Sequence, residues 1–460
     1  MTETATEFEV FSANLRRSVF SIYDRLVTHQ GSVSCCGYIR SCDRRVVAVS
    51  SDDSFLAWSS EADVLLLYIG KSLDENGAVS ERSKVHPIVL PFDTVYPSSD
   101  QHSQYWLRKI YCRSRVTALC FGNVSLNQVT SPLGFGRGVR LKDHTNAVLL
   151  AVGLECGAIR IYSAVTGKFL IDLLDHRGAV EDLTFSPRYS LWHSMLLSCS
   201  RDSTLKLWDL YDGGNMFRTL KGHMTGEYVV CCAWSSNGLW AASGGTDRRL
   251  IVWRTRCWSI HRRTKMHRNC IVDCEFSPDS ALLVSCSSDS TAIVFDHIKG
   301  CPLVTLRHEL PVPLTSYHCA TNRHRVNGLS FSSDGEHIVT ICSDNNMRIW
   351  NISSPQFPCK IVPMRNATSV CYFKNGTSIA VCSHRGTLEI RSAPMSVQRL
   401  SAICRKVLRS TFCLEMLRQC LLPKELHSYL EYGELLLFED CRPILPCPSE
   451  CRRQNGGASN

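Results

Sequence analysis

The chain has 460 residues, of which 44% are hydrophobic and 20% are charged, and its formal net charge is +9 at pH 7. These proportions are ordinary for a globular protein, and no run of about 18 apolar residues occurs, so we expect no membrane-spanning helix. The first residues, MTETATEFEV, are acidic and lack the apolar segment of a secretory signal. We therefore expect an intracellular protein, in the cytoplasm or the nucleus, without a membrane partner.

The 25 cysteines are an odd number in a long chain. A disulfide framework is typical of small secreted chains, and we expect no export signal in this long chain. Many of the cysteines stand in strand-like runs, such as Leu197-Ser198-Cys199, where a thiol acts as a small buried apolar group. We expect no metal and no cofactor; the segment CRPILPCPSEC at 441–451 is the one cluster that merits a metal assay.

Residues 46–70, VVAVSSDDSFLAWSSEADVLLLYIG, are a degenerate first copy of a unit that recurs more clearly further along the chain. The next segment, at about 71–104, is polar and rich in Ser, Asp, Gly and His. This composition predicts a surface loop inserted between the first and second units.

The central part of the chain repeats a unit of about 40 residues. The aromatic residues that end its clear copies, Trp208, Trp253, Phe295 and Trp350, are 45, 42 and 55 positions apart. This period, with a terminal Trp-Asp-like pair, is typical of WD40 repeats, which build propeller blades of four strands. The clear copies are LLSCSRDSTLKLWDL (196–210), 241–254, 283–296 and 338–351, and the weaker copies are 149–163 and 379–392.

Seven units result when residues 46–70 are counted, and seven blades close into a ring without an exposed sheet edge. We therefore predict an all-β seven-bladed WD40 β-propeller over residues 46–395. The N-terminal segment, residues 1–45, is expected to supply the strand that fastens the last blade to the first. A second insertion, at 307–324, lengthens the connection to the sixth blade.

The resemblance to WD40 repeats implies a hydrogen-bond network in each blade, formed by His, Ser or Thr, Asp and Trp. The aspartate in a tight turn would accept hydrogen bonds, and the indole N–H would donate to the hydroxyl. In the fifth blade Phe295 stands in place of Trp and removes that donor. The residues that fit are His176, Ser198, Asp202 and Trp208 in the third blade, His223, Ser243, Asp247 and Trp253 in the fourth, His267, Ser285 and Asp289 in the fifth, and Thr340, Asp344 and Trp350 in the sixth.

No segment of the chain predicts catalysis. The Ser-His-Asp trio repeats once per blade, as a structural device does, and no strained nucleophile elbow accompanies it. The glycine-rich GFGRG at 134–138 lacks the flanking strand, helix and Lys-Ser/Thr of a phosphate loop. We therefore expect a protein that is not an enzyme.

The positive charge is concentrated in residues 248–268, RRLIVWRTRCWSIHRRTKMHR, which hold eight Lys or Arg and no acidic residue. Such a run can bind phosphate, nucleic acid or an acidic peptide, and it is equally typical of a solvated outer strand and loop of one blade. Because Trp253 belongs to a blade network, we favour the solvated strand and do not expect a nucleic-acid partner.

Residues 398–430 predict two short amphipathic helices. Leu400, Cys404 and Leu408 recur every four residues, with Ile403 and Val407 beside them, and form one apolar stripe. A second stripe begins at Leu422-Pro423, with proline at a position that the first turn of a helix tolerates; it continues through Leu426, Tyr429 and Leu430. Helices this short are marginal alone, so they need a partner surface, either the propeller or another protein.

The two stripes, in this order, resemble a SOCS box, the module that docks substrate receptors onto Elongin B/C and a cullin. The resemblance places the module at 396–433, followed by a flexible tail at 434–460, and implies that Leu400, Ile403, Cys404 and Leu408 bind Elongin B/C. It implies cullin contacts at Leu422, Pro423, Leu426, Tyr429 and Leu430. The first proline of the family's Leu-Pro-x-Pro is absent from Cys420-Leu421-Leu422-Pro423, so the Elongin inference is the firmer one.

The whole arrangement is similar to the WD-repeat and SOCS-box-containing family. This resemblance implies a substrate-recognition subunit of an Elongin B/C–cullin–RING ubiquitin ligase, with cullin 5 favoured over cullin 2 and an unknown protein substrate. Two alternatives stay open: a propeller scaffold without ligase activity, whose tail packs internally, and a propeller that binds RNA or phosphoinositide through residues 248–268.

Overall fold

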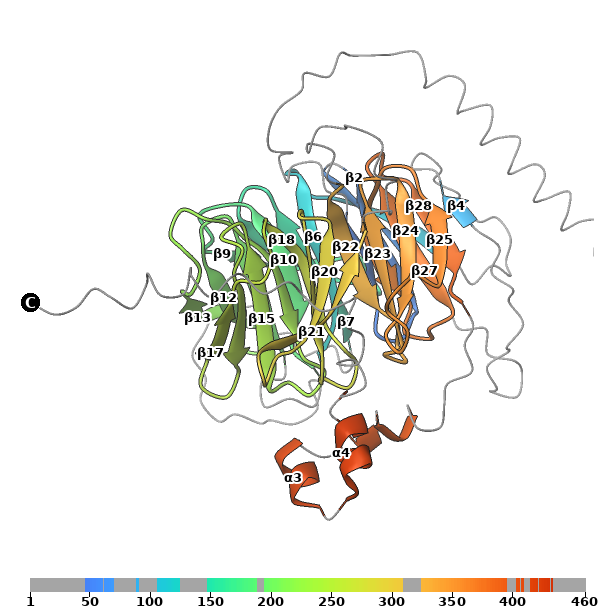
Figure 1. Ribbon diagram of the computed structural model, residues 1–460. Coiled ribbons are helices and arrows are strands. Elements are labelled where there is room, and N and C mark those ends of the chain that lie inside the picture. The colour runs from blue at the N-terminus through green and yellow to red at the C-terminus, as the bar shows by residue number, and fades with distance from the viewer. Residues whose placement is uncertain are drawn as a thin grey trace, which may run out of the picture.

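Seven four-stranded antiparallel sheets follow one another around a ring in the described part of the chain (Figure 1). This confirms the predicted seven-bladed propeller. The computed structural model describes residues 46–60, 62–69, 88–90, 106–124, 147–187, 194–308, 324–394, 403–405, 407–408, 414–420, 422–430 and 432.

Each blade is built from strands that meander outward from the centre of the ring, and the last blade takes its outer strand, β4, from the segment between the third and fourth strands of the first blade. The first two blades consist of β1 (Val47–Val49), β2 (Phe55–Ser60), β3 (Asp63–Tyr68) and β5 (Trp106–Tyr111), then β6 (Val116–Val124), β7 (Ala147–Leu154), β8 (Ala158–Ser163) and β9 (Phe169–Leu174). The third and fourth consist of β10 (Val180–Phe185), β11 (Met195–Ser200), β12 (Leu205–Asp209) and β13 (Asn215–Leu220), then β14 (Val229–Trp234), β15 (Trp240–Gly245), β16 (Leu250–Arg254) and β17 (Ser259–Thr264).

The remaining three blades continue the same order. They consist of β18 (Ile271–Phe276), β19 (Leu283–Ser287), β20 (Thr291–Asp296) and β21 (Cys301–Arg307), then β22 (Val326–Phe331), β23 (His337–Cys342), β24 (Asn346–Asn351) and β25 (Lys360–Pro363), and finally β26 (Ala367–Tyr372), β27 (Ser378–Ser383), β28 (Leu388–Ser392) and β4 (Ile88–Leu90).

The sequence of each strand matches its distance from the centre. The second strand of the sixth blade, HIVTIC (β23), is buried at every position because neighbouring blades cover both of its faces. The outer strand of the fourth blade, SIHRRT (β17), is exposed or half-buried at every position. Hydrophobic runs therefore become middle strands, and charged runs become outer strands.

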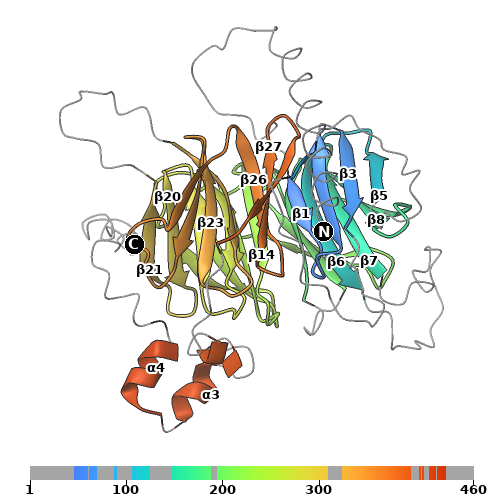
Figure 2. The same ribbon diagram turned by 90° about the vertical axis from the view of Figure 1, so that its right-hand side faces the viewer.

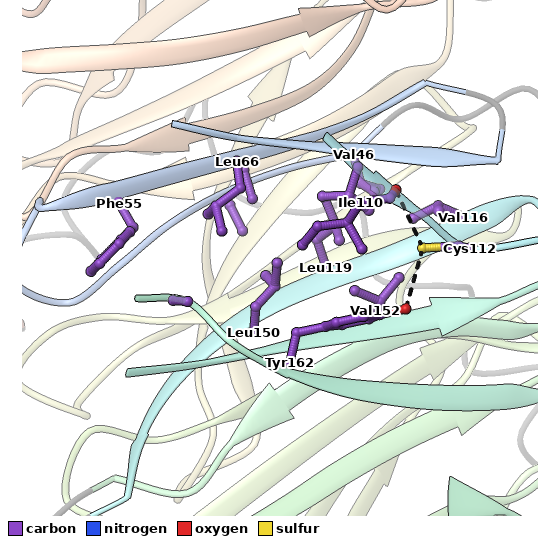
Figure 3. Close-up of a cluster of buried hydrophobic side chains, with 14 of the residues drawn as sticks. Val46, Phe55, Leu66, Ile110, Cys112, Val116, Leu119, Leu150, Val152 and Tyr162 are labelled. Atoms are coloured by element: carbon purple, nitrogen blue, oxygen red, sulfur yellow. Dashed lines mark hydrogen bonds between the residues drawn. The ribbon is translucent and has the colours of Figure 1, made fainter. Parts of the chain in front are cut away.

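Buried side chains fill the space between adjacent blades. Between the first and second blades, Figure 3 shows Phe55, Leu66, Leu119, Leu150 and Tyr162 in one buried cluster. Burial of each such side chain contributes about 1.5–3 kcal/mol. Cys112 lies in the same cluster, and burial raises the pKa of its thiol to about 11, so the thiol behaves as an apolar group.

The ring is closed by β4, which pairs with β28 in the register Ile88↔Ile390, Val89↔Glu389 and Leu90↔Leu388. The expectation that residues 1–45 supply this outer strand was wrong, because β4 occupies the position. It was equally wrong to treat 71–104 as surface loop throughout, since β4 lies within it; residues 1–45 lie outside the described part. Asp53 adds a second closure, accepting hydrogen bonds from the backbone N–H groups of Lys374 and Asn375, both at 2.6 Å.

The strand order gives the ring two distinct faces. One, which we call the tail face, carries the turns between the first and second strands and, in blades two to six, the turns between the third and fourth strands. The other, the far face, carries the turns between the second and third strands and the connections from blade to blade. Helices α3 (Leu414–Gln419) and α4 (Lys424–Leu430) lie beyond the tail face in both views (Figures 1 and 2).

Residues 403–405 and 407–408 are also helical, which places helix at the first predicted stripe. Among the described residues, none of the helices has the length and apolar character needed to cross a bilayer. The predicted flexible tail at 434–460, with the cysteine segment 441–451, lies outside the described residues.

Candidate functional site

The third blade brings His176, Ser198, Asp202 and Trp208 into one buried network. Nδ1 of His176 is 2.7 Å from Oδ2 of Asp202, and its Nε2 is 2.7 Å from Oγ of Ser198. The indole N–H of Trp208 donates to the same Oγ at 2.9 Å. The network therefore joins the connection that precedes β10 to the turn after β11 and to the third strand, β12.

The fourth blade repeats this geometry. The Nδ1 atom of His223 is 3.0 Å from Oδ2 of Asp247, and its Nε2 is 2.9 Å from Oγ of Ser243. The Trp253 indole donates to that hydroxyl at 2.9 Å. In the fifth blade His267 makes the same contacts to Asp289 and Ser285, at 3.1 and 2.9 Å, and Phe295 fills the tryptophan position.

These networks are structural and do not form a nucleophile. Ser198 and Ser243 are completely buried, and each hydroxyl already accepts an indole hydrogen bond. A nucleophilic serine must reach its substrate. Each Ser-His-Asp set instead connects the segment before the first strand of a blade with the second strand and the turn that follows it.

The aspartates of the networks are held in the ionised form. Burial raises the pKa of Asp202, but hydrogen bonds from His176 and Thr204 outweigh it and place the pKa well below the usual range. The same balance, with His267 as the main hydrogen-bond partner, lowers the pKa of Asp289 to about 2. The carboxylates are thus charged at neutral pH and fully engaged in hydrogen bonds.

The sixth blade contains a network histidine that the sequence did not reveal. Nε2 of His308 is 2.8 Å from Oγ1 of Thr340, which also accepts the Trp350 indole at 2.9 Å. Arg348 forms an ion pair with Asp344 in place of a His–Asp contact. Burial, followed by the neighbouring Arg348, lowers the pKa of His308 to about 4, so this imidazole is neutral at physiological pH.

The helical tail is joined to itself and to the propeller by Arg405. Its guanidinium carbon lies 4.1 Å from the ring centre of Tyr429 and 3.9 Å from that of Tyr432, and its Nη1 donates to the Tyr429 carbonyl at 3.1 Å. Only 6% of Arg405 is exposed. Tyr432 in turn packs in the hydrophobic cluster of the fifth and sixth blades, beside Leu282 and Ile352.

The apolar stripe of the first tail helix faces away from these contacts. Ile403 is 40% exposed, Val407 is 55% exposed, and Cys404 is exposed as well. At 100° per residue, Arg405 lies roughly opposite Ile403 and Val407, so packing of the arginine inward turns the stripe outward. Leu408 is half-buried, and Leu400 lies outside the described residues.

The expected cullin residues divide into two groups. Pro423 and Leu426 are exposed, and Leu422 is half-buried. Tyr429 stacks on Arg405 and Leu430 is buried, so these two residues hold the tail together and are not free for a partner in this conformation.

The basic run 248–268 does not form one patch. Strands β16 and β17 pair antiparallel, with Leu250 opposite Thr264 and Arg254 opposite Ser259. The two ends of the run therefore lie at the far face, and its middle lies at the tail face. This division weakens the interpretation of the run as a continuous track for a polyanion.

The fold and the tail together define a class: a seven-bladed propeller of WD40 type, followed by a helical tail that is anchored at one face through Tyr432. The family model for the WD domain, G-beta repeat, matches residues 167–209, 214–254, 258–296 and 312–351. The first three matches each begin with the outer strand of one blade and end with the third strand of the next, so each sequence repeat links two blades.

Similar proteins extend the match beyond the propeller. The chain is 30% identical over 401 residues to human WD repeat and SOCS box-containing protein 1, covering 85% of this chain and 92% of the relative. The Xenopus tropicalis protein of that name is 32% identical over 387 residues, covering 84% and 90%. The chain belongs to the WD repeat and SOCS box-containing protein family.

A solved structure supports the fold alone. A chain in a structure titled "Crystal Structure of Mitotic Checkpoint Complex" matches with a TM-score of 0.54 at 16% identity, covering 80% of this chain and all of that chain. The link to the ubiquitin pathway rests on the SOCS box in the family name and not on the similarity to this solved structure.

Proposed function

We propose that this protein is the substrate-recognition subunit of an Elongin B/C–cullin–RING ubiquitin ligase. The propeller holds the target, and the SOCS box connects it to the subunits that carry ubiquitin. Catalysis belongs to those partner subunits, and this chain contributes proximity by raising the local concentration of target lysines.

The observation that carries the proposal is the exposure of Ile403, Cys404 and Val407 on one side of a helix in a chain of this family. Exposed apolar side chains on a short amphipathic helix mark a protein interface. The tail is anchored to the propeller through Arg405 and Tyr432, and the side chains of this stripe stay exposed when the tail is attached.

We propose Leu400, Ile403, Cys404 and Leu408 as the Elongin B/C contacts. For the cullin, we propose Leu422, Pro423 and Leu426, which follow the Elongin stripe in the chain, and cullin 5 as the partner. Truncation of a central interface residue typically costs about 2 kcal/mol or more, roughly 30-fold in affinity.

Co-expression with Elongin B/C tests the proposal. The tagged full-length chain should co-purify with Elongin B/C, and the double variant Leu400→Ala/Cys404→Ala should lose it while its circular dichroism spectrum stays unchanged. The matched control is Leu174→Ala/Cys156→Ala, which removes an exposed leucine and an exposed cysteine from the propeller. Equal Elongin recovery from both double variants would refute the assignment of these contacts. No Elongin recovery from the wild-type chain would favour a scaffold without ligase activity.

A further inference from the structure

The histidine networks of blades three to five also fix the residue that follows each histidine. The backbone N–H of Arg177 donates to Asp202 at 3.1 Å, that of Met224 to Asp247 at 3.2 Å, and that of Arg268 to Asp289 at 2.8 Å. These three residues therefore occupy equivalent positions in successive blades, all on the far face. All three are exposed.

The acidic groups around these positions point inward or are paired. Asp202, Asp247 and Asp289 accept hydrogen bonds from histidine and backbone groups. Glu181 forms an ion pair with Arg201, and Asp175 forms one with Lys206. In contrast, the side chains of Arg177, Arg248 and Arg268 form no ion pair within the described part of the chain.

Arg248 adds a third exposed cation to this sector. It lies in the turn between β15 and β16, directly after Asp247, whose carboxylate is engaged below it. The guanidinium groups of these three arginines each present a planar fork of donors, which suits carboxylates. Glu227, in the connection that carries Met224 and Tyr228, is half-buried and accepts a hydrogen bond from Thr246. The three exposed arginines outnumber it, so the net charge of the far face over these loops is positive.

An apolar site lies between the arginines. Met224 is 49% exposed and Tyr228 is 45% exposed, and both belong to the connection between the third and fourth blades. This connection is held against the third blade, because the backbone N–H of Gly226 donates to Ser203 at 3.1 Å and Arg201 lies 5.7 Å from the Tyr228 ring centre. Aromatic and methionine side chains flanked by arginine are typical of the central part of a protein interface.

We propose that one surface of the far face, which we call the recognition surface, binds an acidic peptide segment of the target protein. This surface consists of Arg177, Met224, Tyr228, Arg248 and Arg268. Carboxylates of the peptide would pair with the arginines, and an apolar side chain between them would contact Met224 and Tyr228. The inference rests on the proposed receptor function and deepens it by naming the chemistry of the target and the face that binds it.

A peptide fits this surface better than a nucleic acid does. Binding of single strands uses a series of aromatic side chains on which successive bases stack. Within the described loops of this sector, Tyr228 is the one exposed aromatic side chain. The arginines also come from separate loops and do not follow a continuous track.

Fluorescence anisotropy with the full-length chain tests the inference. The probe is a fluorescein-labelled 12-residue peptide with four glutamates around one leucine, and the control probe has glutamine at each glutamate. We expect binding of the acidic peptide that weakens with salt, because exposed charges are screened. A wild-type chain that binds both peptides equally, or neither, overturns the inference.

Charge reversal locates the site. Arg177→Glu/Arg268→Glu should weaken binding of the acidic peptide at least 10-fold, whereas Arg256→Glu/Arg263→Glu, an equal charge change at exposed positions off this surface, should change it less than 2-fold. Met224→Ala should weaken the leucine-containing peptide and leave a leucine-to-serine peptide unaffected. Equal losses in both double variants, or tighter arginine-dependent binding of a 12-nucleotide single-stranded RNA, would overturn the proposal.

Failure of this inference is distinguishable from failure of the receptor function. Arg177→Glu/Arg268→Glu should retain Elongin B/C, and Leu400→Ala/Cys404→Ala should retain the peptide. Peptide binding without any Elongin binding leaves the recognition surface intact and removes the ligase role, and Elongin binding without peptide binding does the reverse.

Discussion

The phenol of Tyr432 donates a hydrogen bond to Oδ2 of Asp279 at 2.8 Å, and both side chains are buried. Asp279 lies in the turn between β18 and β19 on the tail face, so this bond joins the helical tail to the fifth blade. A hydrogen bond to a charged group typically contributes about 1.5–3 kcal/mol. The tail therefore has a defined orientation, and in a ligase that orientation would set where a bound target lies relative to ubiquitin.

Tyr432→Phe should loosen the tail without unfolding the propeller. The substitution leaves the buried carboxylate of Asp279 with one hydrogen bond fewer and keeps the aromatic stack on Arg405. Hydrogen exchange in α3 and α4 should become faster, while exchange in β19 and β23 stays as in the wild type. If the tail exchanges at the wild-type rate, the Tyr432–Asp279 bond does not hold it.

The blade networks predict a measurable role for the indole donor. Trp253→Phe should destabilise the protein by about 1 kcal/mol, because the Ser243 hydroxyl loses one hydrogen-bond donor. Trp208→Phe should have a similar effect in the third blade. Chemical denaturation measures both variants. An unchanged free energy of unfolding in both variants would show that the indole hydrogen bond does not stabilise the blade. The fifth blade, in which Phe295 lacks this donor, forms without such a bond.

His308 predicts a pH dependence of stability. Its pKa in the folded protein is about 4, below the ordinary value of 6.5 that the unfolded chain retains. Between these values the unfolded state binds more protons, so stability falls as the pH falls through 6.5 toward 4. This one group should cost on the order of 2 kcal/mol between pH 8 and pH 5.

The variant His308→Gln isolates that contribution, because its amide can still reach Thr340 and does not titrate. Its denaturation midpoint should change less between pH 8 and pH 5 than that of the wild type. A variant that follows the wild-type pH curve would contradict the assignment of this slope to His308.

Ring closure by β4 predicts that a short segment far from the last blade in sequence stabilises it. Replacement of Ile88–Leu90 by Gly-Ser-Gly removes the pairing with β28 and should lower the melting temperature by several degrees. The same replacement at Asn76–Ala78 is the control and should have little effect. Equal melting temperatures would mean that Asp53 and the inner strands close the ring without β4.

The sequence predicts the blades well because each blade repeats a strong local pattern of buried strands and turns. It does not reveal β4, which has only three residues, belongs to a polar insertion and pairs with a strand from the other end of the propeller. Such pairing depends on tertiary geometry, which no local pattern encodes.

The missed His308 has a specific cause. In blades three to five the histidine precedes its serine by 22, 20 and 18 residues, whereas His308 precedes Thr340 by 32, because an insertion lies between them. A search at the usual spacing passes over it. The spacing of 10 residues between Thr340 and Trp350 repeats that between Ser198 and Trp208, and this repetition indicated a network in the sixth blade.

Charge was harder to interpret from sequence than apolar pattern. The basic run 248–268 is conspicuous, yet the β16–β17 hairpin distributes it over both faces. Arg177 and Arg268 are far apart in sequence, and only the repeated hydrogen bond after each network histidine places them on one face. Arg405 gave no sequence signal for its inward stack, because a single arginine beside an apolar stripe is usually solvated.

Hydrogen exchange of the full-length chain, with and without Elongin B/C, measures whether the exposed stripe of the tail binds the adaptor. Residues 403–408 should become strongly protected on addition of Elongin B/C, with the blades of the propeller unchanged. A stable complex that protects the propeller and leaves residues 403–408 exchanging freely, or no complex at all, would contradict this prediction.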